Sequence, residues 1–118
     1  VEGQAMAELR YLPQIIGTDT LETGIRASQL FQFITPTVVR VNNLETAEMI
    51  KLIDNTKRDV IFGFSNEVAH LCDVAGLSAD EVINAGRFGY ARTDLPTPGP
   101  VAGPCLSKDS HILVQSMM

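Results

Sequence analysis

Several motifs that identify common classes of protein are missing from the sequence. Its 118 residues contain no GxGxxG and no P-loop, so a nucleotide cofactor has no recognisable phosphate cradle. The two cysteines, Cys72 and Cys105, stand far apart, without a CxxC or a nearby pair of histidines. Neither a zinc site nor a disulfide framework is therefore indicated.

Charge and hydropathy argue against further classes. The formal net charge is -5 and no basic patch stands out to neutralise phosphates, which argues against a general nucleic-acid binder. No apolar run reaches membrane-spanning length, and no basic start with a small-residue cleavage site marks a signal peptide. We therefore expect a cytoplasmic protein with no nucleic-acid partner and no membrane contact.

What is present is an ordinary globular composition. Hydrophobic residues make up 45% of the chain and charged residues 19%, which describes one domain, or one domain plus a piece of another. The chain opens on Val1 without an initiator Met and closes on the apolar run HILVQSMM, which has no stop signal. We expect both ends to be cut from a longer protein.

The stretch from Thr46 to Ala75 is predicted to form one long helix, because it contains no proline and its apolar residues recur at helical spacing. At about 1.5 Å per residue it would be about 45 Å long. Its wide apolar face consists of two neighbouring stripes: Met49, Ile53, Val60, Phe64, Leu71 and Ala75, and beside them Ile50, Ile61, Val68 and Cys72. A chain this short needs a partner for part of that face, so we predict a homodimer built on the helix 46–75.

Ahead of the long helix, the pattern predicts a βαβ unit. Glu2 to Leu12 has helix-forming composition, and a short strand from Gln14 to Ile16 follows Pro13. A second strand, from Thr37 to Val41, is β-branched and should run parallel to the first. Because two strands alone make a poor sheet, we interpret residues 1–43 as the trailing edge of a larger α/β domain. Residues 44–118 then form a separate helical domain.

The helix between the two predicted strands should begin at Asp19, which has Glu22 at capping-box spacing, and should close at Pro36. Its apolar residues predict a buried stripe: Leu21, Ile25, Leu30 and Ile34.

Turn and cap signals divide the second half. Asn43 is the predicted N-cap of the long helix and Gly76 its left-handed C-terminal residue. Ser78 with Glu81 predicts a further helix start, and this short helix should end at Gly86. Residues 87–104 hold four prolines and three glycines, which indicates a long irregular loop of the kind that is usually functional or mobile. A final helix is predicted from Cys105 onward.

Few residues in the chain have a setting that favours chemistry. Cys105 lies between the loop and the predicted helix start, where the helix N-terminus and Lys108 would both favour the thiolate. Asp109 follows one helical turn later. A structural cysteine remains the alternative, and core packing is the expected role of Cys72. Lys51 and Asn55 are i and i+4 on the polar side of the long helix, where they would either hold one ligand atom or simply face solvent.

Taken together, two segments resemble the UDP-glucose/GDP-mannose dehydrogenase family, the nucleotide-sugar dehydrogenases. They are KLIDN, residues 51–55, and PGPVAGPCLSKD, residues 98–109, and the stretches between them are similar to the family at matching intervals. VEGQAMAELRYLPQII, residues 1–16, resembles the end of its dinucleotide-binding domain. The resemblance implies a mainly α fold like the C-terminal domain of 6-phosphogluconate dehydrogenase. One long helix would dominate it, with a remnant βαβ edge of the N-terminal Rossmann domain.

The resemblance also implies a function and roles for residues. The family uses NAD to oxidise the C6 alcohol of a UDP- or GDP-sugar to a carboxylate in two steps, for surface polysaccharide precursors. Cys105 matches the nucleophile that holds the aldehyde as a thiohemiacetal and then a thioester. Lys51 and Asn55 match residues that steady the reacting oxygen, and Asp109 matches the aspartate that positions water.

Substrate contacts are implied at four further positions. Glu2 falls where the family has a glutamate near the substrate, and Arg87 resembles an arginine that reaches the sugar from a neighbouring subunit. Lys108 matches a basic residue before the aspartate. Where relatives commonly have two glycines ahead of the residue before the cysteine, this chain has Ala102 and Gly103.

NAD would be bound by an N-terminal domain outside this sequence, so the 118 residues alone are expected to be inactive. The competing interpretations are a stand-alone helical dimerisation module without catalysis and a cysteine hydrolase. The hydrolase is disfavoured because neither His70 nor His111 has a spacing that nominates it as a base.

Overall fold

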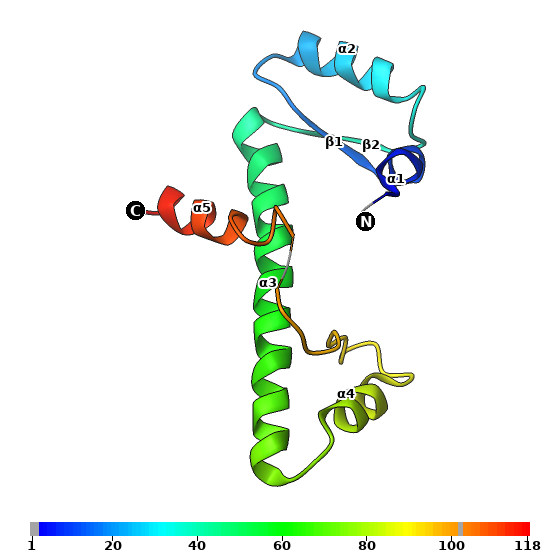
Figure 1. Ribbon diagram of the computed structural model, residues 1–118. Coiled ribbons are helices and arrows are strands. Elements are labelled where there is room, and N and C mark those ends of the chain that lie inside the picture. The colour runs from blue at the N-terminus through cyan, green and yellow to red at the C-terminus, as the bar shows by residue number, and fades with distance from the viewer. Residues whose placement is uncertain (1–2, 102) are drawn as a thin grey trace. The chain divides into compact units, whose positions relative to one another are not determined.

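The computed structural model describes residues 3–101 and 103–118, so Glu2 and Ala102 lie outside the described part of the chain. The elements, in order, are α1 (Ala5–Tyr11), β1 (Gln14–Gly17), α2 (Leu21–Phe31), β2 (Val38–Val41), α3 (Leu44–Ala75), α4 (Ala79–Arg87) and α5 (Asp109–Ser116) (Figure 1). The predicted fold class, mainly helical with one long helix and a small βαβ edge, is confirmed.

The chain separates into two compact units, residues 1–51 and residues 52–118, and α3 contributes to both. A compact unit is not by itself an independently folding domain. The predicted division into domains 1–43 and 44–118 therefore stays a prediction.

The first unit is built around the predicted pair of parallel strands, in which Gln14 is paired with Val38 and Gly17 with Val41. Helix α2 packs on both strands and buries Gly24 and Ser28 there. The hydroxyl of Thr35, which is 2% exposed, donates to the carbonyl of Leu12 at 2.9 Å and ties the end of α2 to the start of β1.

Three predictions about α2 are wrong. The helix ends at Phe31 and not at Pro36. Its N-cap is Thr20 rather than Asp19, because the Thr20 backbone is extended and its hydroxyl accepts from the N–H of Thr23 at 3.2 Å. The predicted buried stripe is exposed, because a sheet of two strands covers only a narrow strip of the helix, and the small Gly24 and Ser28 occupy it. The exposed residues of that stripe are Leu21, Ile25, Leu30 and Ile34.

Helix α3 begins and ends where its caps predict. The side chain of Asn43 accepts from the N–H of Thr46 at 2.9 Å. At the other end Gly76 has φ +69°, and the N–H of Leu77 donates to the Cys72 carbonyl at 2.9 Å, which is the hydrogen bond of a Schellman ending.

The predicted start of α4 agrees with the structure, whereas the predicted start of α5 does not. The predicted Ser78 cap of α4 is confirmed, with the Glu81 N–H at 3.3 Å, and α4 ends at Arg87, one residue beyond Gly86. The final helix was predicted from Cys105, but α5 begins at Asp109.

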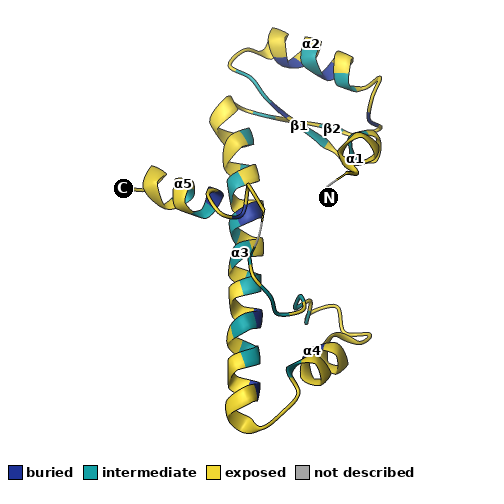
Figure 2. Ribbon diagram, viewed as in Figure 1, coloured by how far each residue is buried: buried dark blue, intermediate teal, exposed yellow. Residues whose placement is uncertain are grey.

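Burial on α3 is confined to few positions. Its buried residues are Asn55, Ser65 and Cys72, and Figure 2 shows buried positions on the side that faces the segment after α4. Cys72 is 5% exposed, so its predicted core role is confirmed. The first stripe of the predicted apolar face, by contrast, is open to solvent in the single chain, where Met49, Ile53, Val60, Phe64 and Leu71 are all exposed. In the second stripe, Ile50, Ile61 and Val68 are half-buried.

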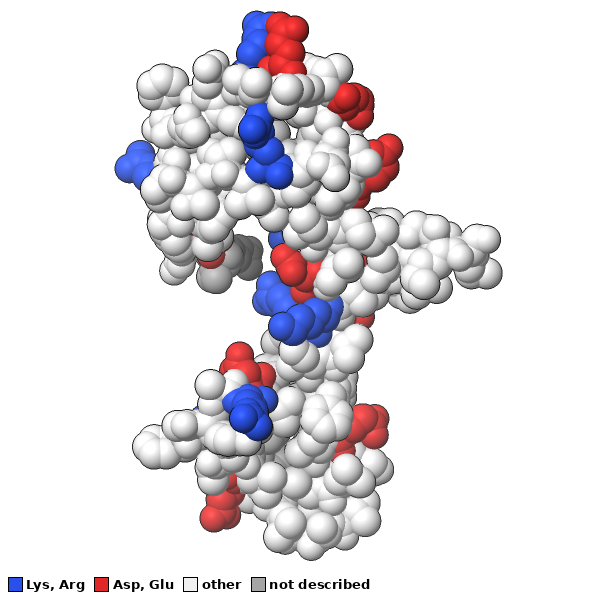
Figure 3. Space-filling model, turned by 180° about the vertical axis from the view of Figure 1, so that it is seen from behind, with Lys and Arg blue, Asp and Glu red and all other residues white. Residues whose placement is uncertain are grey.

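Charges of both signs occur in small groups on the face drawn in Figure 3. Across residues 3–101 and 103–118, no helix is long and apolar enough to cross a membrane. The same described residues hold no group of three or more His, Cys, Asp or Glu side chains placed to bind a metal ion.

Candidate active site around Cys105 and Asp109

The candidate site forms where the chain returns along α3. After α4 the irregular segment runs back beside α3 to the start of α5, as the yellow to orange ribbon in Figure 1 shows. Polar side chains of α3 hold this segment by hydrogen bonds at Pro96, Gly99 and Asp109. The long loop predicted at residues 87–104 is therefore attached to the helix.

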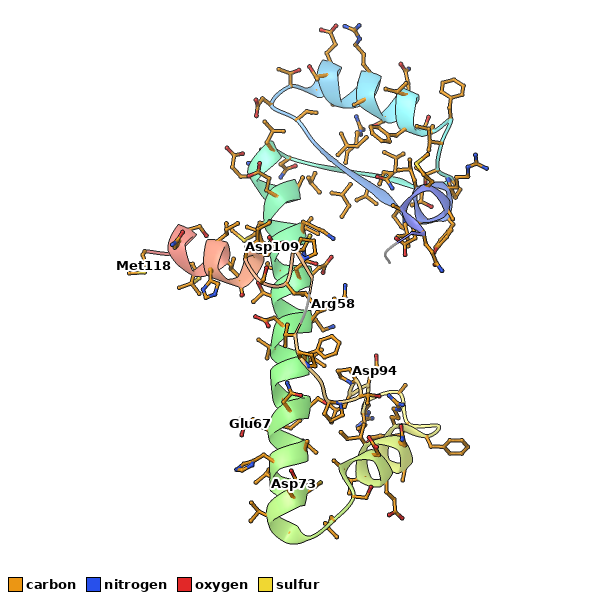
Figure 4. The ribbon with its side chains drawn as sticks, viewed as in Figure 1. Arg58, Glu67, Asp73, Asp94, Asp109 and Met118 are labelled. Atoms are coloured by element: carbon orange, nitrogen blue, oxygen red, sulfur yellow. The ribbon has the colours of Figure 1, made fainter. Side chains whose placement is uncertain are left out.

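Asp109 is the most enclosed charged group of the site. It is 5% exposed and lies at the base of α5 against α3 (Figure 4). The side-chain amide of Asn55, itself 4% exposed, donates to one carboxylate oxygen at 2.6 Å. Lys108 forms an ion pair with the other oxygen at 2.6 Å. A carboxylate held by these two contacts keeps a fixed orientation.

Lys108 reaches Asp109 from the solvent side, since 60% of its side chain is exposed. The hydrogen bond and the negative charge of Asp109 raise the pKa of the Lys108 ammonium, and slight desolvation opposes them. The negative charge of a Cys105 thiolate adds a smaller contribution that also raises this pKa.

Cys105 is exposed, with a free thiol. It lies in the turn before α5, and its carbonyl accepts from the N–H of Lys108 at 3.2 Å and from that of Asp109 at 2.9 Å. The prediction that Cys105 opens the helix is thus off by one turn, because this turn binds both amides and regular α-helix starts only at Asp109. The neighbouring Leu106 is 8% exposed and anchors the turn in the core.

Gly103 has φ +119°, a conformation that residues with a side chain rarely adopt. A Cβ at this position would meet nothing within 4 Å, so the backbone conformation, not space, requires glycine. Of the predicted substrate contacts, Glu2 lies outside the described residues.

Lys51 and Arg87 were predicted to act at the same site. Lys51 is exposed on α3, one turn before Asn55. Arg87, at the end of α4, donates to the side chain of Asn84 at 2.6 Å and to the Leu95 carbonyl at 3.3 Å, so it braces its own loop. Its reach to a neighbouring subunit stays a prediction.

The sequence analysis missed the attachment of the loop by Ser65 and Asn66. Asn66 donates to the Gly99 carbonyl at 2.9 Å and accepts from the Gly99 N–H at 2.8 Å. The hydroxyl of Ser65, fully buried, donates to the Pro96 carbonyl. The available signal was a serine and an asparagine side by side in a helix that must pack against a proline-rich segment.

The arrangement combines groups suited to acyl chemistry at sulfur. The accessible thiol of Cys105 lies one turn before the buried carboxylate of Asp109. The amide of Asn55 orients this carboxylate, and the ammonium of Lys108 balances its charge. Such a carboxylate can hold a water molecule, and the ammonium can stabilise negative charge on sulfur or oxygen.

Comparison with known proteins gives consistent matches. A family model described as "UDP-glucose/GDP-mannose dehydrogenase family, central domain" matches residues 45–118. The UDP-N-acetyl-D-mannosamine dehydrogenase of Yersinia pestis is 36% identical over 113 residues, which cover 95% of this chain and 27% of that protein. The enzyme of the same name from Methanococcus vannielii is 30% identical over 114 residues, which cover 96% of this chain and 26% of that protein.

Solved structures give the same picture. The structure of a UDP-D-ManNAc dehydrogenase from Pyrococcus horikoshii superposes with a TM-score of 0.88 at 34% identity, over 96% of this chain and 27% of that one. The UDP-N-acetyl-mannosamine dehydrogenase of S. aureus gives a TM-score of 0.73 at 27% identity, over 98% of this chain and 28% of that one. The chain thus spans about a quarter of the length of the proteins that it matches.

Proposed function

The chain belongs to the UDP-glucose/GDP-mannose dehydrogenase family, and from this premise we propose that it is the central part of a nucleotide-sugar 6-dehydrogenase. The complete enzyme would use NAD to oxidise the C6 alcohol of a UDP- or GDP-sugar to a carboxylate, for surface polysaccharide precursors. The relatives' names favour UDP-N-acetyl-D-mannosamine as the first substrate to test.

The observation that carries the proposal is the grouping of Cys105, Lys108, Asp109 and Asn55. Cys105 provides an accessible sulfur, and Asp109 is the only one of these charged groups that is buried. Asn55 donates one amide hydrogen to Asp109, which leaves its second amide hydrogen for the reacting oxygen. Lys51, one helical turn earlier, is proposed to act on the same oxygen, as the family resemblance implies.

In the proposed reaction the Cys105 thiol adds to the C6 aldehyde. A carbon–sulfur bond forms, the carbonyl π bond opens, and the thiol proton passes to the oxygen to give a thiohemiacetal. Loss of a hydride from that carbon and of a proton from the hydroxyl gives a thioester. Water held by Asp109 then adds to the thioester carbon. The carbon–sulfur bond breaks, the sulfur takes up a proton, and the sugar acid leaves.

NAD would accept the hydride in both oxidations. The 118 residues do not fit this cofactor, since they contain no glycine-rich phosphate cradle, and we assign none of them to it. The residues before position 44 resemble only the end of the domain that binds the cofactor in the family. Gly103 and Lys108 are proposed to lie toward the sugar, as are Glu2 and Arg87.

We further propose a homodimer in which the exposed face of α3 packs against a second copy. Val60 is 64% exposed and Phe64 57%, and neighbouring exposed apolar side chains on one helix face mark an interaction surface. Beside them a shallow apolar hollow of about 330 Å³ lies between α3 and α5, lined by Ile53, Thr56, Lys57, Val60, Ile61 and Leu113. The hydroxyl of Thr56 is buried there without a hydrogen-bond partner among the described residues.

The proposed function is tested with the full-length protein, UDP-N-acetyl-D-mannosamine and NAD. We expect two molecules of NADH for each molecule of sugar acid, because alcohol and thiohemiacetal are each oxidised by one hydride transfer. If this sugar is not oxidised, UDP-glucose and GDP-mannose are the next substrates. Absence of NADH formation with all three would contradict the proposal and favour the non-catalytic dimerisation module.

A further inference from the structure

We propose that Ser65 and Asn66 of α3 are positioning residues for Cys105, because they hold the far end of the loop that carries the thiol. This inference rests on the proposed function and extends it to two residues that do not touch the reacting atoms. It follows from the hydrogen bonds at Pro96 and Gly99 and from the composition of the loop.

The loop cannot fix its own shape by backbone hydrogen bonds. Between α4 and Cys105 it contains prolines 96, 98, 100 and 104, each of which lacks a backbone N–H. A segment with so few donors forms no regular ladder, and its carbonyl groups need partners from elsewhere. Helix α3 supplies those partners.

Asn66 makes the more specific attachment. Its amide nitrogen donates to the Gly99 carbonyl at 2.9 Å, and its amide oxygen accepts from the Gly99 N–H at 2.8 Å. The side chain thus pairs with both backbone groups of one residue, as a neighbouring strand would. Only a group with a donor and an acceptor side by side makes this pair, so aspartate loses half of it and places its charge against a carbonyl oxygen.

Ser65 adds a second attachment three residues before Gly99. A serine within a helix commonly turns its hydroxyl back to a carbonyl of its own helix. Here the hydroxyl instead donates to the Pro96 carbonyl, and the residue is fully buried under the loop. The two neighbouring side chains therefore fix both ends of the segment 96–99.

The two ends of the loop are attached to the same helix. Gly99 is bound at Asn66 and Asp109 at Asn55, and these two positions of α3 lie eleven residues apart, or about 16 Å along the axis. Cys105 lies on the chain between them. Its sulfur is thus placed by both attachments, and release of either one lets the thiol move relative to α3. Displacement of a reacting group by about 1 Å can cost about 10²-fold in rate.

The test compares the two oxidation steps in the full-length enzyme. In Asn66→Asp, we expect acid formation to fall about tenfold or more relative to aldehyde formation, because only the second oxidation needs the sulfur. A merely structural role would lower both steps together through the amount of folded enzyme and leave the ratio unchanged. Ser65→Ala removes the other attachment with less change in the core and should shift the ratio in the same direction.

The matched control is Asp73→Asn, the reverse exchange at an exposed position of α3 (Figure 4). It should leave the ratio of aldehyde to acid unchanged. A ratio that is unchanged in both Asn66→Asp and Ser65→Ala would overturn the inference.

A measurement on the chain itself separates this inference from the proposed function. In Asn66→Ala, which removes the acceptor of the Gly99 N–H, the Gly99 amide should exchange with solvent at least tenfold faster than in the unmodified chain, as followed by NMR. Equal exchange rates would overturn the inference whatever the enzyme does. Protection of Gly99 together with full-length protein that oxidises no nucleotide sugar would instead contradict the proposed function, and with it the role of the loop in catalysis.

Discussion

At the scale of single residues, the site depends on how Asp109 is held. A carboxylate that is 5% exposed is stable only when hydrogen bonds and an opposite charge replace the lost water. Asn55 supplies a hydrogen bond and Lys108 supplies the positive charge. The contact with Asn55 also attaches the start of α5 to α3, so the orientation of the carboxylate and the packing of the helix depend on the same hydrogen bond.

Asn55→Ala should destabilise the chain, because it removes a donor from a buried carboxylate. A lost hydrogen bond of this kind typically costs about 1–3 kcal/mol. Urea unfolding of the variant would measure it, with Asn42→Ala at an exposed position as the control. An unchanged unfolding midpoint for Asn55→Ala would show that water replaces the amide at no cost.

Lys108 predicts a loss of stability at alkaline pH. Asp109 raises the lysine pKa in the folded chain above its unfolded value, so the ion pair stabilises the fold fully below the unfolded pKa. The stabilisation disappears as the pH rises through the folded value, which lies above the ordinary lysine pKa of about 10.4.

Lysines titrate roughly between pH 9 and pH 12. Over this range the free energy of unfolding should therefore decline less in Lys108→Met than in the unmodified chain. The effect is small, since the ammonium is largely exposed. Lys51→Met, at an exposed position of α3 outside the apolar hollow between α3 and α5, is the control for general alkaline titration. Identical declines in the unmodified chain and in Lys108→Met would contradict the role given to the ion pair.

At the scale of elements, α3 has two different sides. One side binds the loop and α5 through polar groups, and the other leaves Val60, Phe64 and Leu71 exposed. A helix with such a face is stable only when that face is covered, since packing rather than propensity supplies most helical stability. A second copy of the chain is the cover that we propose.

Phe64→Asp should therefore dissociate the dimer or unfold the chain, because an unpaired carboxylate buried in an interface costs several kcal/mol. Light scattering of the purified chain checks this directly. Phe88→Asp makes the same exchange at an exposed phenylalanine outside α3 and should leave the mass unchanged. A monomer for the unmodified chain would refute the dimer.

The elements show which sequence signals are reliable. The caps at Asn43, Gly76 and Ser78 were predictable, because each depends on one side chain or one backbone conformation close in sequence. The buried stripe of α2 was not, because burial depends on what covers a helix. The attachment of Gly99 to Asn66 joins residues that are 33 positions apart, and no local pattern specifies it.

At the scale of the whole molecule, the chain spans about a quarter of the length of its relatives. The family resemblance pointed to Cys105, Asn55 and Asp109 from motif positions alone, and the structure brings the last two into contact. Motif positions do not specify the ion pair of Lys108 or the attachment of the loop, because both depend on three-dimensional packing.

The 118 residues alone should neither bind NAD detectably nor oxidise a nucleotide sugar. The reason is the missing glycine-rich cradle, without which the pyrophosphate has no set of backbone N–H groups to bind. Titration calorimetry of the purified chain with NAD should give no heat of binding. A clear binding isotherm would show that the chain holds a cofactor site that its sequence does not reveal.

The central claim is that Cys105 is the nucleophile, and product analysis of the full-length Cys105→Ala enzyme tests it most directly. The variant should form no sugar acid, while the first oxidation, which needs no sulfur, should be reduced much less. Cys72→Ala, at the buried cysteine, is the matched control and should still form acid. Sugar acid formed by Cys105→Ala at near the original rate would contradict the account at its centre.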